Sequence, residues 1–273
     1  MDLTRRLAQG RTELAGWLLL VAIVLSVMHG LDSGLAPAAP GAAFWIAGLL
    51  LFAQVTGLQR VQTLLMLLVG AVGLGYAWSQ GQAPEWGKAL ATNQALLAML
   101  AGVTFLRLIS LPETQADEAD PRGRAALWRT LLGVHLFGSV INLSAVMILG
   151  DRQSRNAPLT PLQASVLSRG FALAAHWSPF FAAMGIALTN APGAQLLTLS
   201  SIGLPLAAVG LGVSAWQLSR WPDAATFVGY PMHFAALWIP ALLAILVLTA
   251  HEILPTVPIL SLISSLALAM TLG

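Results

Sequence analysis

The chain has 273 residues, of which only 9% are charged and 57% are hydrophobic, and its mean hydropathy is +0.79. An ordinary soluble domain carries about 25% charged residues, and this chain has too few polar side chains to cover a globular surface. The composition therefore excludes a soluble fold and predicts that lipid surrounds most of the chain. The absence of cysteine excludes disulfides, thiolate metal sites and cysteine nucleophiles.

Long stretches contain no Asp, Glu, Lys or Arg, and each is close to or longer than the ~20 residues that a helix needs to cross a bilayer. They are residues 14–31, 33–59, 61–84, 89–106, 130–150, 170–219, 224–251 and 253–273. None shows the alternating polar and apolar residues of a membrane β-strand. The sequence therefore predicts an all-α, polytopic integral membrane protein.

The first 110 residues are expected to form a scaffold of four spans. We place these spans at residues 14–30, 41–58, 61–78 and 90–110. Short links rich in Gly and Pro join them, which is typical of tight turns between antiparallel helices. The longest polar stretch follows at residues 111–129, with four acids and three arginines, and is predicted to be a cytoplasmic linker.

Residues 130–220 contain two features that differ from plain spans. The first is the uncharged run at residues 131–150, whose polar centre lies between two apolar arms and contains Gly138, Ser139, Asn142 and Ser144. This pattern fits a re-entrant hairpin whose polar tip is buried in protein at membrane depth. It also fits a single span whose Asn and Ser side chains bond to neighbouring helices.

The distribution of basic residues favours the hairpin, because cytoplasmic loops of membrane proteins are enriched in Lys and Arg. Of the 13 basic residues, Arg169 lies within an apolar segment and is set aside. If every run crosses the membrane once, eight of the remaining twelve basic residues are cytoplasmic. If residues 131–150 return to the side from which they entered, eleven are cytoplasmic and only Lys88 is outside. The N-terminus, with Arg5, Arg6 and Arg11, is then cytoplasmic in an inner (plasma) membrane.

The second feature is the apolar segment at residues 162–190, which is long for one straight crossing. Proline disfavours helix at the residue before it and leaves a carbonyl group without its helical partner. Because Pro179 lies mid-segment, we expect two half-helices that meet near residues 176–179. With further spans at residues 194–218, 229–250 and 254–273, the chain is predicted to have about eight crossings, one re-entrant hairpin and one broken helix.

A scaffold of spans, a cytoplasmic hairpin with Asn142 and Ser144 at its tip, and a broken helix resemble one repeat of the ion transporter superfamily. That group includes sodium/dicarboxylate symporters and arsenite and sodium/proton antiporters. The resemblance is one of architecture and covers about residues 1–220, with residues 221–273 as two spans that begin a second inverted repeat. It implies secondary transport of a small, anionic solute coupled to a sodium or proton gradient, with no other cofactor.

A complete transporter of this architecture needs both repeats. We therefore expect the chain to be the N-terminal part of a longer transporter, or one half that pairs with a second half-transporter or with a copy of itself. Two other functions stay open: a non-transporting membrane assembly subunit and a membrane-embedded enzyme. No catalytic, metal-binding or nucleotide-binding motif is found, so an enzyme, a metal site and a nucleic-acid partner are not expected.

The candidate residues for binding solute or ion are Ser139, Asn142, Ser144, Arg169, His176 and Ser178. Arg169 has two interpretations, attraction of an anion or snorkelling of its side chain to the cytoplasmic headgroups. His176 has two as well, transfer of a proton or solute contact, and a structural role at the helix break. His135, on the first arm of the hairpin, is interpreted as structural.

Overall fold

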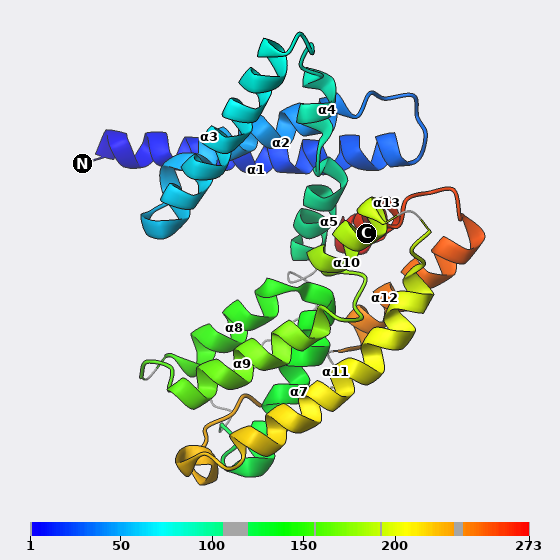
Figure 1. Ribbon diagram of the computed structural model, residues 1–273. Coiled ribbons are helices and arrows are strands. Elements are labelled where there is room, and N and C mark those ends of the chain that lie inside the picture. Colours follow the sequence, from blue (N-terminus) through cyan, green and yellow to red (C-terminus); the bar gives the residue numbers. More distant parts are fainter. Residues whose placement is uncertain (1, 106–119, 156, 192, 232–236, 273) are drawn as a thin grey trace. The chain divides into compact units, whose positions relative to one another are not determined.

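The computed structural model describes residues 2–105, 120–155, 157–191, 193–231 and 237–272. The protein is 78% helical, and the described residues contain no β-strand. The all-helical class predicted from composition is therefore confirmed. The chain forms two compact units, Met1–Ala98 and Met99–Gly273, and each is described by itself (Figure 1).

The first unit is built on a close pair of helices, α1 and α2. Four alanines lie buried along this pair, Ala15 and Ala22 on α1 and Ala43 and Ala47 on α2. Small side chains allow two helices to approach closely, which is the usual packing mode of helices in lipid. The helices of this unit are α1 (Asp2–Gly30), α2 (Ala38–Leu51), the 3-10 helix η1 (Phe52–Gln54), α3 (Gly57–Ser79), α4 (Trp86–Ala91) and the start of α5 (Gln94–Phe105).

Two elements of this unit differ from plain packed spans. Helix α3 has no buried residue, so its apolar surface is not covered within the unit. The span expected at residues 90–110 is interrupted, because Asn93 adopts a left-handed backbone conformation with φ of 64° and separates α4 from α5. Asparagine is one of the few residues that tolerate this conformation. Residues 106–119 of the predicted span and linker lie outside the described residues.

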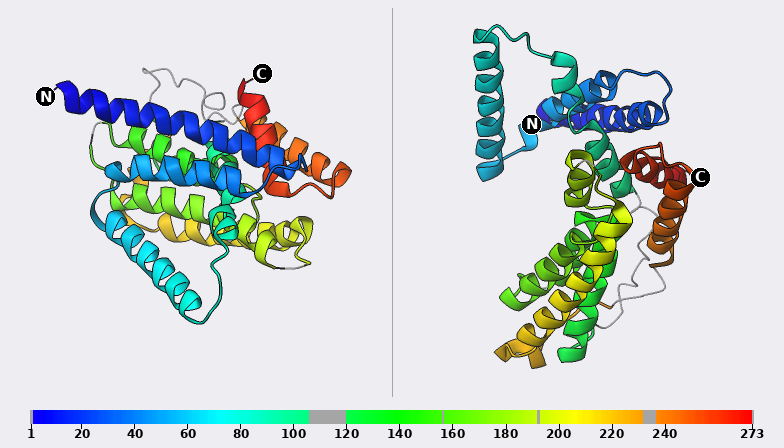
Figure 2. Two further views of the ribbon diagram at one scale, coloured as in Figure 1. Left: turned by 90° about the horizontal axis from the view of Figure 1, so that it is seen from above. Right: turned by 45° about the vertical axis from the view of Figure 1, so that its right-hand side comes forward.

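The second unit contains a bundle in which α7, α9 and α11 lie side by side (Figure 1, Figure 2). Helix α7 begins at Arg124, inside the segment predicted as a linker, because Gly123 with φ of 87° turns the chain and good helix formers follow. The helices are α7 (Arg124–Ile141), α8 (Leu143–Gln153), α9 (Pro161–Ala174), α10 (Ala182–Asn190), α11 (Leu196–Leu218), the 3-10 helix η2 (Pro222–Ala225), α12 (Trp238–Ile253) and α13 (Ile259–Leu272).

One end of this bundle is closed by an apolar cluster and an extended chain segment. Residues 227–229 pair with residues 121–123: Gly123 N–H donates to the Phe227 carbonyl (2.9 Å) and Gly229 N–H to the Pro121 carbonyl (2.8 Å). The buried cluster beneath comprises Ala126, Leu127, Leu131, Leu162, Val166, Ala215, Leu218, Ala224 and Phe227. We call this the closed end of the bundle.

Three helical stretches among the described residues are long and apolar enough to cross a membrane: Gln9–Gly30, Gly57–Ser79 and Leu196–Leu218. Shorter apolar helices occur at Ala38–Gln54, Ala241–Ile253 and Ile259–Leu272. A membrane location therefore agrees with the length and composition of these helices. The number of crossings and the orientation stay predictions.

Candidate functional site

The helix through residues 131–150 breaks at Asn142, the centre of the run from which a hairpin is predicted. Asn142 has φ of 55° and ψ of −140°, and its Oδ1 accepts a hydrogen bond from the N–H of Leu143, the first residue of α8 (2.8 Å). The side chain therefore caps α8 while the backbone reverses the chain.

The outer ends of α7 and α8 meet at the closed end of the bundle. Arg152, near the end of α8, forms an ion pair with Asp120, just before α7 (3.5 Å). Gln153 Nε2 donates to the Val228 carbonyl (3.5 Å), within the segment that also pairs with Gly123. The chain thus leaves the closed end along α7, turns at Asn142 and returns to the same end along α8.

The apolar segment at residues 162–190 is broken between α9 and α10, where the sequence predicts a break. Residues 175–181 are not helical, and Ser178 organises them. Its Oγ accepts a hydrogen bond from the N–H of Phe180 (3.1 Å). Pro179, the residue between, has no N–H to place in a helix.

The hairpin tip and the helix break are in direct contact. Asn142 Nδ2 donates to the Phe180 carbonyl (3.0 Å), and Ser178 Oγ donates to the Ser139 carbonyl. Both bonds join a side chain of one element to a backbone carbonyl that helix disruption has freed in the other. We call these four residues, Ser139, Asn142, Ser178 and Phe180, the junction.

Helix α11 supports the broken segment from the other side. Ser200 Oγ donates to the Trp177 carbonyl (2.7 Å). One turn further along α11, Gly203 lies so close to the break that a Cβ there would overlap the carbonyl oxygen of His176. A residue without a side chain is therefore required at this position.

His135 connects the hairpin to the broken helix one turn before the tip. Its Nε2 accepts a hydrogen bond from the indole N–H of Trp177 (3.0 Å), which places its proton on Nδ1, and Nδ1 then donates to the Gly170 carbonyl (3.1 Å). This placement agrees with the interpretation of His135 as a structural residue, because both of its ring nitrogens are used in holding α7 against the broken segment.

Four helix termini converge at the junction. Helices α8 and α10 begin there, and α7 and α9 end there. Helix N-termini carry partial positive charge and favour anions, whereas C-terminal carbonyl groups favour cations. The junction therefore offers both kinds of electrostatic environment without a charged side chain.

The junction lies about halfway along a bilayer thickness from the closed end. Leu131, two residues after the last arginine of α7, lies 11 residues before Asn142, a rise of about 16 Å, against about 30 Å of hydrocarbon. This depth fits a tip near the middle of the membrane.

The structure does not bring every candidate residue to the junction. Arg169 Nη1 donates to Gln217 Oε1 on α11 (2.9 Å), and Gln217 lies 14 residues beyond Gly203, about 21 Å along that helix. This placement fits the snorkelling interpretation of Arg169. His176 is exposed, with Nδ1 against the carbonyl of Leu173 near the end of α9 (3.1 Å), and Ser144 is half-buried on α8.

Sequence reasoning missed the residues that support the junction from outside it: His135 as a contact of Trp177, and Ser200 and Gly203 on α11. The contact of His135 could have been predicted from its spacing, because His135 and Ser139 are four residues apart and lie on one helical face. Ser200 and Gly203 gave a weaker signal, because they are two of many small residues in α11.

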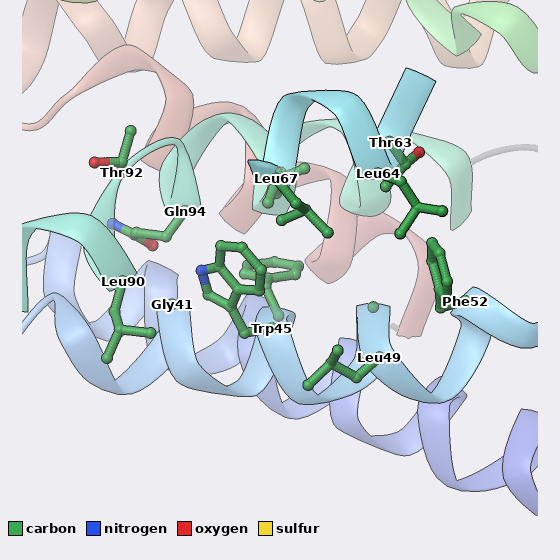
Figure 3. Close-up of a pocket in the computed structure, with 13 residues that line it drawn as sticks. Gly41, Trp45, Leu49, Phe52, Thr63, Leu64, Leu67, Leu90, Thr92 and Gln94 are labelled. Atoms are coloured by element: carbon green, nitrogen blue, oxygen red, sulfur yellow. The ribbon is translucent and has the colours of Figure 1, made fainter. Parts of the chain in front are cut away.

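The first unit contains a separate apolar pocket of about 550 Å³ between α2, α3 and the start of α5. Figure 3 shows Trp45 and Leu49 on one wall and Leu64 and Leu67 on the other. Gln94 lines one end; it is only 7% exposed, and its Oε1 has no hydrogen-bond partner among the described residues. The lining offers hydrophobic contact and one free acceptor.

Comparison with models of protein families, with curated proteins and with solved structures found no match to this chain. The resemblance to the ion transporter superfamily therefore stays a prediction from the order of the elements in the sequence.

Proposed function

We propose that this chain is a multi-pass inner-membrane protein that forms part of a secondary transporter, and that a small anionic solute binds at the junction. The observation that carries the proposal is the direct contact between the hairpin tip and the helix break, through Asn142 to Phe180 and Ser178 to Ser139. Non-helical backbone at membrane depth occurs where it is buried in protein or lines a cavity that holds solute or water.

The chemistry of the junction favours an anion accompanied by a cation. The N-termini of α8 and α10 supply N–H groups for the anion, and the carbonyl groups that end α7 and α9 supply oxygen ligands for a coupling sodium ion or proton. In this proposal the two side-chain hydrogen bonds close the tip over the break. A solute would take the place of one or both when the hairpin opens.

Uptake into vesicles tests the proposal. The full chain, with any second half that it requires, is reconstituted and offered labelled mono- and dicarboxylates under an imposed sodium or proton gradient. Asn142→Ala and Ser178→Ala should each lower uptake about tenfold, since loss of a buried polar partner costs about 1 to 3 kcal/mol. Matched controls are Asn190→Ala and Ser168→Ala, whose side chains are exposed and bond only within their own helices.

Equal uptake by the junction variants and the controls, with all proteins stably inserted, would remove the basis for placing the site at the junction.

The second candidate function is that of a non-transporting assembly subunit. Helix α3 favours it, because an apolar helix with no fully buried residue in its own unit is suited to contact with another membrane protein. This candidate would be favoured if no labelled solute accumulates in the vesicles, with or without a gradient, and a membrane partner co-purifies stably with the chain.

A further inference from the structure

Two cavities with Trp128 in both linings lie between α7 and α11, one basic and aromatic and the other mainly apolar; we call the two together the groove. The first cavity, of about 530 Å³, is lined by Arg124, Trp128, Trp216, Ser219 and Arg220. The second, of about 360 Å³, shares Trp128 and is otherwise lined by Arg129, Leu131, Leu132, Ala208, Leu211 and Gly212. The groove therefore has a charged end and an apolar end.

The charged end is held in place and its arginines are available. Trp128 Nε1 donates to Ser219 Oγ (3.1 Å), which ties α7 to α11, and the guanidinium of Arg220 lies 3.8 Å from the ring centre of Trp216. Arg124, Arg129 and Arg220 are exposed. The ion pairs within the described parts of the chain, Lys88 with Glu85 and Arg152 with Asp120, involve none of them.

We propose that this groove binds an anionic phospholipid, with its phosphate at Arg124 and Arg220 and one acyl chain along Leu132, Ala208 and Gly212. Arginines recognise phosphate oxygens in a bidentate manner, and tryptophans favour the headgroup level of a bilayer. From Arg220 to Ala208 the groove runs 12 residues along α11, about 18 Å, which is close to the depth of one leaflet, about 15 Å. The assignment rests on membrane insertion and is independent of solute transport.

Other occupants fit the groove less well. An apolar helix of another protein would fill the apolar cavity but leave Arg124 and Arg220 without an anionic partner. A free phosphate ester would satisfy the arginines but leave the apolar cavity without a partner. Only a molecule with an anionic head and a long apolar chain fills both parts.

Lipid binding by the purified full chain in neutral detergent tests the assignment. Phosphatidylglycerol should bind about tenfold more tightly than phosphatidylcholine with the same acyl chains, and Arg124→Gln combined with Arg220→Gln should remove this preference. The matched control is Arg122→Gln combined with Arg155→Gln, which removes the same charge from two exposed arginines outside the groove and should retain the preference.

The apolar cavity is tested by Gly212→Leu. A Cβ added at Gly212 has open space around it, and Gly212 lines the cavity, so leucine should extend into the cavity and weaken phosphatidylglycerol binding about tenfold. Unchanged binding by Gly212→Leu would overturn the acyl-chain placement. If the control pair also lost the preference for phosphatidylglycerol, the preference would depend on net charge rather than on the groove. If equimolar glycerol phosphate displaced the lipid, the arginines would bind a free phosphate ester. Either result would overturn the proposal.

Discussion

Asn142 combines a strained backbone with two side-chain hydrogen bonds. Its φ and ψ of 55° and −140° lie in a region that glycine occupies far more readily than other residues. Its amide caps α8 and also reaches Phe180. A residue kept in an unfavourable conformation for its side chain is a sign of a functional position.

Replacement of Asn142 separates the effect of backbone strain on stability from that of the two hydrogen bonds. Asn142→Ala loses both hydrogen bonds and retains the strain, whereas Asn142→Gly loses the bonds and relieves it, so the glycine variant should be more stable by about 1 kcal/mol. Thermal unfolding of both variants in one detergent measures the difference. An alanine variant as stable as the glycine variant would show that the backbone at residue 142 is not strained.

Gln94 gives a second prediction for a single side chain. Its buried Oε1 lacks a protein partner, and such a group costs about 1 to 3 kcal/mol. Gln94→Met keeps the side-chain length and removes the amide, so it should raise the unfolding temperature of the detergent-purified protein. The exposed Gln80 provides the matched control, and Gln80→Met should have little effect. A lower unfolding temperature for Gln94→Met would mean that the amide makes a stabilising contact.

Two glycines of α11 distinguish close helix packing from helix propensity. A Cβ at Gly203 would overlap the His176 carbonyl, whereas a Cβ at Gly212 meets nothing. Gly203→Ala should therefore destabilise the protein by about 2 kcal/mol or more, as overpacking does, while Gly212→Ala should be neutral or stabilising by up to about 1 kcal/mol. Unfolding midpoints of the two variants provide the measurement. Equal midpoints would show that α11 does not press on the break.

The positions of the two helix breaks could be predicted from sequence because each has a local cause. Pro179 removes a helical N–H, and a cluster of small polar residues surrounds Asn142. The hydrogen-bond partners across the junction are 38 and 39 residues apart, and no local pattern specifies which carbonyl each side chain reaches. The position of Arg169 could not be predicted either, because a long side chain can reach toward either end of a helix.

At the scale of the whole molecule, the arginines of the second unit agree with a single orientation. Those at the start of α7, the end of α8 and the end of α11 lie at or near the closed end of the bundle: Arg122, Arg124, Arg129, Arg152, Arg155 and Arg220. The sequence predicts that these six share the cytoplasmic side. If α7 crossed the membrane completely, Arg152 would lie on the side opposite Arg124, yet Arg152 pairs with Asp120, four residues before Arg124.

The measurement that tests the re-entrant hairpin most directly is cysteine labelling in intact cells, because the chain has no cysteine of its own. Ser154→Cys, just after α8, and Ser219→Cys, just after α11, should both resist an impermeant thiol reagent added outside and react after the cells are opened. Gln82→Cys, in the turn after α3, should react from outside and serves as the positive control. Labelling of Ser154→Cys in intact cells would place the end of α8 outside and contradict the hairpin on which the proposed junction depends.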